Sequence, residues 1–118
     1  MGDSEQKFDL AFLNKISGGD ENFIKEMITT FKELAPEYVE KATLYLENAD
    51  YDSLSREAHK FLPGVSFLGI KYLEEDIALI EEYAKKHINI EELGALLQSS
   101  IKKIDEIIES FNKEFDLN

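Results

Sequence analysis

The residues best suited to nucleophilic chemistry in this sequence are its two histidines, His59 and His87. At neutral pH an ordinary imidazole is largely uncharged, so one ring nitrogen keeps a lone pair that can attack phosphorus. An exposed ring of this kind is sufficient to accept a phosphoryl group. The chain has no cysteine, which excludes disulfides, thiolate metal sites and a cysteine nucleophile. Phosphoryl acceptance by a histidine is therefore the first chemistry to consider.

The sequence lacks the patterns of an enzyme that acts alone. It contains no glycine-rich phosphate loop and no HExxH pair. A di-metal helical bundle needs Glu-x-x-His pairs, but the residues three before the histidines are Arg56 and Ala84. We therefore expect no metal site and no independent catalytic activity. Any catalysis would have to come from a partner.

His59 lies in a predicted helix whose apolar stripe includes Ala58. At about 3.6 residues per turn, His59 is about 100° round from Ala58 and off that stripe, so we expect its ring to be exposed. His87 follows two lysines in a connection and is interpreted as an incidental surface histidine. The predicted neighbours of His59 on the outer face are small or charged: Ser55, Arg56, Pro63 and Ser66.

Five segments carry the apolar periodicity of helices, and none alternates like a half-buried strand. The first covers residues 10–16, after the N-cap candidate Asp9 and before a Ser-Gly-Gly stop. The second begins after Asp20 and ends at residues 48–50. Pro36 lies inside it, which predicts a kink or a split near residues 32–36.

The third helix is predicted to begin after Asp50 or Asp52, and Gly69 separates it from the fourth. Asn89 and Glu92 resemble a capping box that opens the last helix, which has the longest Leu and Ile stripe. Short connections favour antiparallel neighbours. The sequence therefore predicts an all-α fold, an antiparallel up-and-down four-helix bundle with a short extra N-terminal helix across one end.

The chain is strongly acidic, with 13 Lys and Arg against 25 Asp and Glu and a net charge of -12. Such a charge repels phosphate backbones, so nucleic acid and anionic membrane surfaces are poor candidate partners. Two acidic groups, residues 74–76 and 81–82, lie mostly off the apolar stripe of the fourth helix. We interpret both groups as solvated surface.

A length of 118 residues with 43% hydrophobic residues fits one domain, residues 1–118, with order expected from about 8 to 116. No apolar run approaches the roughly 20 residues that span a bilayer. The polar start lacks the core of a signal peptide. We therefore expect a cytoplasmic protein. With no obvious unpaired apolar helix face, it is expected to be a monomer.

The stretch Arg56–Phe61, with the sequence REAHKF and closing at Leu68-Gly69, resembles the signature of histidine-phosphotransfer (HPt) domains of two-component phosphorelays. The segment Ile16–Phe23, and Asp50 at the start of the third helix, are similar to the same family. Together these stretches cover most of the chain in the family's order.

The resemblance implies that His59 is the phospho-acceptor and that the protein passes a phosphoryl group between response-regulator receiver domains, one of which can belong to a hybrid histidine kinase. It implies a phosphocarrier with no cofactor and no catalytic activity of its own. The receiver would supply the phospho-aspartate, Mg²⁺ and most of the catalysis. Phosphoryl transfer depends mainly on positioning and charge stabilisation, so a bare exposed nucleophile can suffice when its partner brings the cation.

Two positions depart from the family pattern. The family usually has Lys three residues after the histidine and Gly at the next position, whereas this sequence has Leu62 and Pro63, with Gly64 displaced by one. Pro63 cannot donate to the carbonyl of His59, and its ring crowds that carbonyl. Leu62, before a proline, is also pushed away from helical dihedrals. We therefore expect the helix to kink or break just beyond His59.

Three cations are candidates to replace the missing lysine: Arg56, Lys60 and Lys85. Arg56 is favoured, because residues three apart share a helix face and a guanidinium suits phosphate oxygens. Lys60 is adjacent to His59, and Lys85 would reach the site from the neighbouring helix. The full set of candidate phosphate- or partner-binding residues is Ser55, Arg56, Lys60, Pro63, Gly64, Ser66 and Lys85.

Two alternative functions stay open. The first is a bundle that docks receiver domains without accepting phosphate, with Leu62 and Pro63 as signs of lost chemistry. The second is an unrelated helical scaffold or oligomerisation domain in which His59 is incidental. Burial of the His59 ring in the core would favour the scaffold.

Overall fold

A computed structural model describes residues 8–115, which form five α-helices, one short 3-10 helix and no strand. None of these helices is long and apolar enough to cross a membrane. The all-α prediction is confirmed. The expected order up to residue 116 includes Asp116, which lies outside the described residues, as do residues 1–7. The helices are α1 (Ala11–Ser17), α2 (Glu21–Glu47), α3 (Tyr51–Phe67), α4 (Lys71–Lys86), η1 (Ile90–Glu92) and α5 (Leu93–Phe115).

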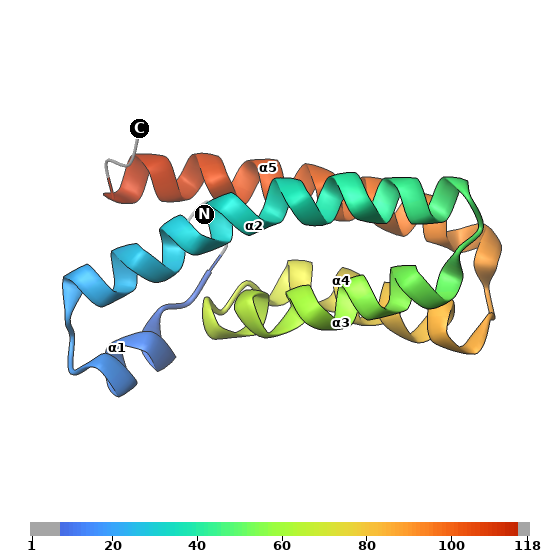
Figure 1. Cartoon of the computed structure of the whole chain (residues 1–118). Coiled ribbons are helices and arrows are strands. Elements are labelled where there is room, and N and C mark those ends of the chain that lie inside the picture. Colours follow the sequence, from blue (N-terminus) through green and yellow to red (C-terminus); the bar gives the residue numbers. More distant parts are fainter. Residues whose placement is uncertain (1–7, 116–118) are drawn as a thin grey trace, which may run out of the picture.

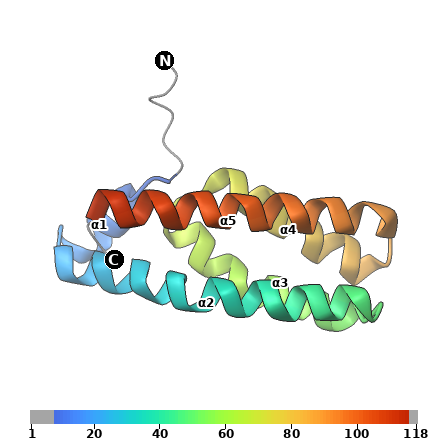
Figure 2. The ribbon, with the colours of Figure 1, turned by 90° about the horizontal axis from the view of Figure 1, so that it is seen from above.

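The four long helices form the predicted antiparallel up-and-down bundle (Figure 1). Each packs against two others, since α3 contacts α2 and α4 while α5 contacts α4 and α2. The view from above shows α5 running alongside α2 (Figure 2). The short helix α1 covers the end of the bundle where α2 begins (Figure 1).

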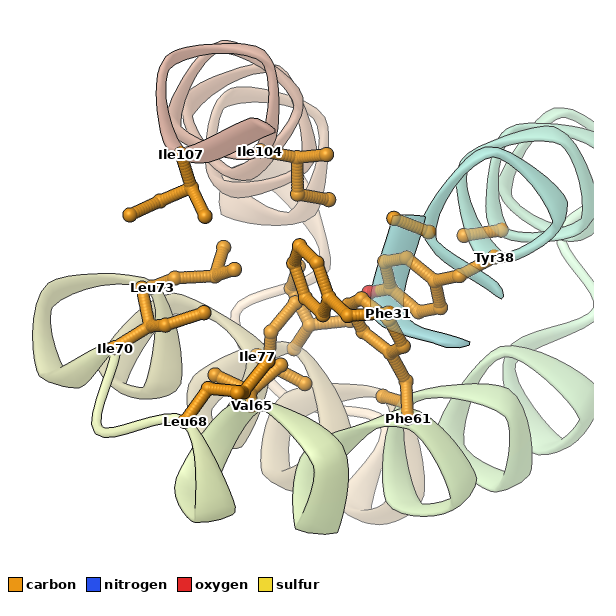
Figure 3. Close-up of a cluster of buried hydrophobic side chains, with 14 of the residues drawn as sticks. Phe31, Tyr38, Phe61, Val65, Leu68, Ile70, Leu73, Ile77, Ile104 and Ile107 are labelled. Carbon is orange, nitrogen blue, oxygen red and sulfur yellow. The ribbon is translucent and has the colours of Figure 1, made fainter. Parts of the chain in front are cut away.

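The bundle core draws residues from all four long helices. Phe31 and Tyr38 from α2 meet Phe61 from α3, with ring centroids 5.7 Å and 4.5 Å from that of Phe61. Figure 3 shows these rings facing Ile77 from α4 and Ile104 from α5. The apolar stripes predicted from the sequence therefore converge in one cluster, and this cluster fixes which faces of α3 and α4 remain outside.

Aspartate side chains cap two of the long helices as predicted. One carboxylate oxygen of Asp20 accepts hydrogen bonds from the backbone N–H groups of Asn22 and Phe23, at 3.0 Å and 3.4 Å. Asp50, rather than Asp52, caps α3 by accepting from the N–H of Ser53 at 3.2 Å. These bonds satisfy amide groups that the first helical turn leaves without partners.

The sequence predicted a kink or a break at each of two prolines, and the break is wrong at both. α2 continues through Pro36, bending along its length in Figure 1 without splitting, and α3 continues through Pro63 to Phe67. A proline inside a helix costs about 3 kcal/mol. Buried residues on both sides of Pro63, Phe61 and Val65, each contribute about 1.5–3 kcal/mol by burial and hold α3 on the core. Packing therefore outweighs the lost hydrogen bond.

The predicted capping box at the start of the last helix is also wrong. Asn89 has a left-handed backbone, with φ of 48°, and its side chain makes no cap hydrogen bond. Its carbonyl oxygen instead accepts from the N–H of Glu92 at 2.9 Å and opens η1. A side-chain cap normally needs an extended backbone at the N-cap residue, and the turn out of α4 does not leave Asn89 in that conformation.

The first acidic group of α4 is not simply solvated surface. Asp76 is only 7% exposed, and its Oδ2 lies 3.0 Å from Lys103 Nζ and 2.7 Å from Ser99 Oγ of α5. The cation and the hydroxyl compensate the carboxylate for the loss of water. The interpretation as solvated surface is wrong at Asp76. The periodicity of α4 alone does not show that Lys103 and Ser99 of α5 lie opposite this residue.

The turn between α3 and α4 is tight and depends on Gly69. Its φ is +64°, a left-handed conformation that glycine adopts without penalty. The N-terminal segment crosses directly over this turn, where the N–H of Asp9 donates to the carbonyl of Leu68 at 3.3 Å. A Cβ added to Gly69 would lie within 2.8 Å of three backbone atoms of Asp9. Both the backbone conformation and the contact therefore require glycine here.

Replacing Gly69 with alanine is expected to destabilise the protein by at least about 1–2 kcal/mol, the cost of a left-handed conformation for a residue with a Cβ. The collision with Asp9 adds to that cost. Urea unfolding followed by circular dichroism measures the change. Gly64→Ala is the matched control, because Gly64 lies inside α3 with no atom within 4 Å of an added Cβ. It is expected to raise stability by up to about 1 kcal/mol. Equal effects of the two substitutions would contradict this account of the turn.

Candidate functional site

His59 lies on the outer face of α3, with its side chain 76% exposed. Ala58 and Phe61, which belong to the apolar stripe of the same helix, are buried in the core. The predicted exposure of the ring is therefore confirmed. Burial of this ring would have favoured the unrelated scaffold, and the ring is not buried.

The ring of His59 is held in a defined orientation by Glu81 of α4. The Nδ1 atom of His59 lies 2.8 Å from Oε2 of Glu81. An ionised carboxylate can only accept a hydrogen bond, so Nδ1 carries the proton and donates it to Glu81. In the neutral ring the lone pair is then on Nε2. The nucleophilic nitrogen is thus defined by a contact to the neighbouring helix.

The interpretation of residues 81–82 as solvated surface is wrong for Glu81. Its backbone carbonyl accepts a hydrogen bond from Ser55 Oγ at 3.3 Å, while its side chain reaches His59. Ser55 is itself only 8% exposed. The prediction that Ser55 lies on the outer face beside His59 is therefore also wrong, because the close packing of α3 against α4 covers it. Ser55 anchors the segment of α4 that carries Glu81.

An open hollow of about 620 Å³ lies beside His59, between α3 and α4. All three predicted cations, Arg56, Lys60 and Lys85, contribute to it. The residues that line the hollow are Asp52, Ser55, Arg56, His59, Lys60, Glu81 and Lys85. The fold thus brings together positive charge from two helices next to an exposed imidazole.

The cations of the hollow make few competing contacts. Arg56 Nη2 donates to Ser53 Oγ at 3.1 Å, and among residues 8–115 no carboxylate forms an ion pair with Arg56. Lys60 Nζ is 3.9 Å from an oxygen of Glu57, at the edge of ion-pair distance. Lys85 is exposed. A phosphoryl group on His59 would meet these cations without displacing strong ion pairs, although their binding of phosphate stays a prediction.

The remaining predicted site residues lie outside this hollow. Pro63 is exposed one turn beyond His59, and Gly64 lines a separate hollow of about 70 Å³ between α2 and α3. Ser66 was expected on the same outer face, but its Oγ donates to Glu74 of α4 at 2.8 Å. Leu62, at the position of the family's usual lysine, packs against the core. These positions therefore add no charged group to the site.

His87 lies on the surface as expected, with its side chain 55% exposed, but it makes two contacts with α3. It ends α4 with a left-handed backbone, φ of 56°, and its Nε2 lies 3.2 Å from Oδ1 of Asp52. The edge of its ring faces the ring of Tyr51, with centroids 5.5 Å apart. A second histidine–carboxylate contact thus joins α3 to α4 through Asp52, which also lines the hollow.

Sequence reasoning missed Glu81 and Asp52, and the sequence contains only a coarse signal for their contacts. In an antiparallel pair of helices joined by a tight turn, residues at equal distances from the turn lie opposite each other. Equal counts outward from Gly69 pair His59 with Leu79 and Asp52 with Lys86, whereas the observed partners are Glu81 and His87. Counting from the predicted glycine break therefore reaches the right turn of α4 but not the contacting residue.

Comparison with known proteins supports the fold. No model of a known protein family matches the sequence, and no curated protein matches it. The crystal structure of histidine-containing phosphotransfer protein B from Pseudomonas aeruginosa PAO1 superimposes with a TM-score of 0.84 at 22% sequence identity. The match covers 94% of this chain and 96% of that chain. At this identity the likeness shows a shared fold, and it confirms at that level the resemblance noted from the sequence.

The contact between Glu81 and His59 predicts a single tautomer of the neutral ring. Nitrogen-15 NMR should show His59 protonated at Nδ1 in the wild type, and Glu81→Ala should shift the ring toward protonation at Nε2. Glu81→Gln should largely preserve the tautomer, because the amide oxygen can still accept from Nδ1. Glu82→Ala is the control, since Glu82 contacts Lys86 rather than His59. If Glu81→Ala left the tautomer unchanged, the contact would not set the nucleophilic nitrogen.

Proposed function

We propose that the protein is a phosphorelay phosphocarrier that accepts a phosphoryl group on His59 from the phospho-aspartate of one receiver domain and passes it to another. The observation that carries the proposal is the setting of His59. Its ring is exposed, Glu81 accepts from Nδ1 and so leaves the lone pair on Nε2, and three cations line the adjacent hollow. This setting occurs in a bundle with the fold of a histidine-containing phosphotransfer protein.

The proposed transfer needs little catalytic equipment on this chain. The lone pair of Nε2 forms the N–P bond as the P–O bond to the receiver aspartate breaks, and the electron pair of that bond leaves with the carboxylate. The phosphorylated ring keeps the proton on Nδ1 and carries positive charge beside Glu81. That carboxylate stabilises the charged ring in both directions of transfer. The receiver is proposed to supply Mg²⁺, and this chain to have no cofactor or independent activity.

Arg56, Lys60 and Lys85 are proposed to take the place of the lysine that the family usually has one turn after the histidine. Arg56 has the geometry to present two N–H groups to phosphoryl oxygens. The cations come from α3 and α4, and with Leu62 turned to the core they are the positive groups that line the hollow at His59. They would offset the charge of the phosphoryl group without enclosing it.

The receiver is proposed to dock over apolar side chains that the bundle leaves exposed on α1, α2 and α3. Leu34 of α2 is 48% exposed and lines the small hollow shared with Lys60 and Gly64. Phe67 at the end of α3 is also exposed and stacks on Phe12 of α1, with centroids 5.8 Å apart. An apolar patch beside a polar site is typical of a protein-binding surface. The proposal includes a monomer and the cytoplasmic location expected from the sequence.

A second candidate function is receiver docking without phosphoryl transfer. It is favoured by Leu62 and Pro63, which replace the family's usual lysine and glycine. The two functions differ in one measurable property, the formation of phosphohistidine on this chain.

Incubation with phosphorylated receiver domains and Mg²⁺ is expected to place acid-labile, base-stable label on the wild-type protein. His59→Gln should abolish the label, because the amide is not a nucleophile. His87→Gln should retain it, since Nε2 of His87 faces Asp52 rather than the proposed phosphate hollow. Absence of label on the wild type with several receivers would refute phosphoryl acceptance. Binding of those receivers without label would instead support the docking module.

Arg56→Gln and Lys85→Gln are each expected to slow transfer from the receiver by up to about fivefold. This is the effect of losing an exposed charge interaction worth about 0.2–1 kcal/mol. Rapid-quench measurements of the transfer rate, repeated at two salt concentrations, test the prediction because screening should shrink the difference. Lys86→Gln is the matched control, since Lys86 pairs with Glu82 and does not line the hollow. Equal slowing by Lys86→Gln would mean that only net charge matters.

A further inference from the structure

Two reciprocal histidine–carboxylate contacts join α3 to α4 at the hollow beside His59. In one, His59 of α3 meets Glu81 of α4 at 2.8 Å. In the other, Asp52 of α3 meets His87 of α4 at 3.2 Å. Asp52 precedes His59 by seven residues, about two helical turns, and also lines the hollow. The second contact therefore acts on a charge that lies within the proposed phosphate site.

Asp52 has a second possible partner on its own helix. Arg56 follows it by four residues, and an acidic residue four positions before a basic one is the favourable order for an ion pair on a helix. That pair is not formed. Oδ1 of Asp52 faces Nε2 of His87, while Arg56 Nη2 donates to Ser53 Oγ. His87 and Arg56 are thus alternative partners for one carboxylate.

The position of His87 suits it to hold Asp52. The backbone at His87 is left-handed, which is unfavourable for a residue with a Cβ and commonly occupied by glycine at a helix end. The contacts of the imidazole with Asp52 and with the ring of Tyr51 offset that strain. A protonated imidazole would also interact favourably with the carboxyl end of α4.

We propose that His87 is a positioning residue for the phosphate site: by holding Asp52 against α4, it keeps Arg56 available to the phosphoryl group on His59. This inference rests on the proposed function. It adds that His87 determines how much positive charge Arg56 presents to the phosphoryl group. Without His87, Asp52 pairs with Arg56 and lowers the positive charge that faces the phosphoryl group.

The other charged groups near Arg56 have partners other than His87. Asp50 caps α3, and its pKa is lowered chiefly by hydrogen bonds from Ser53, with Arg56 as a smaller contributor. Lys60 and Lys85 line the hollow but do not contact Asp52 through any ion pair in residues 8–115. The effect of removing His87 should therefore run through Asp52.

The test measures the charge at the phosphoryl group directly. Potassium phosphoramidate transfers its phosphoryl group to imidazole with release of ammonia, so the protein is phosphorylated without a receiver. Phosphorus-31 NMR then gives the pH midpoint at which the phosphoryl group on His59 loses its last proton. His87→Gly removes the side chain and suits the left-handed backbone. It is expected to raise that midpoint by about 0.3 pH unit, because Arg56 becomes paired with Asp52.

Three further variants test whether the effect passes through Asp52 and Arg56. Adding Asp52→Asn to His87→Gly should return the midpoint to the wild-type value or below it. In an Arg56→Gln background, His87→Gly should have no effect. Lys86→Gln should leave the response to His87→Gly intact. An unchanged midpoint in His87→Gly, or a shift that persists without Arg56, would overturn the proposal and leave His87 as a helix-end contact.

A second readout needs no phosphate. The NMR signal of the Arg56 side-chain N–H group should move in His87→Gly and return when Asp52→Asn is added. If both readouts respond as expected while receivers fail to label His59, the positioning role stands and the phosphocarrier function fails. If receivers label His59 but neither readout responds, the phosphocarrier stands and the positioning role fails.

Discussion

The site on this protein depends on the register of α3 against α4, and that register is fixed by the turn at Gly69. The left-handed glycine and the backbone of Asp9 that lies against it leave no room for a different turn. Each helix residue is then placed by its distance from the turn. A slip of one residue would rotate a face by about 100°, so that Ile80 or Glu82 rather than Glu81 would face His59. A backbone constraint some ten residues from the histidine therefore decides which nitrogen of its ring is free.

The parts of the structure that the sequence predicted are those set by local rules. The apolar stripes gave the helices and the outward position of His59, because helical periodicity depends on the chain alone. The caps at Asp20 and Asp50 follow from short-range hydrogen bonds. The failures at Pro63 and Asp76 have another origin. There a local penalty competes with contacts to other helices, and the sequence does not show the size of those contacts.

Ser55 and Glu81 illustrate the same limit at the candidate site. Each was assigned from its own helix, Ser55 as an outer-face residue and Glu81 as solvated surface, and each is used by the neighbouring helix instead. For Glu81, an equal count outward from the predicted turn at Gly69 pairs His59 with Leu79, so the sequence locates the facing turn of α4 but not the residue. The burial of Ser55 depends on how closely the two helices approach, which no count of residues provides.

The net charge of -12 and the cations at His59 act at different ranges. At physiological salt, screening limits the range of interactions between exposed charges to about 8 Å. A phosphoryl group on His59 would therefore respond more to Arg56, Lys60 and Lys85 than to the net charge of the whole chain. Exposed charges of this kind each stabilise an anion by about 0.2–1 kcal/mol. Weak interactions of this size suit a phosphocarrier. Any free energy that stabilises the phosphorylated state adds to the barrier for transfer of the group to the next receiver. Several exposed cations would lower the energy of the bound group slightly while leaving transfer to the next receiver open, whereas a buried lysine clamp would slow its release.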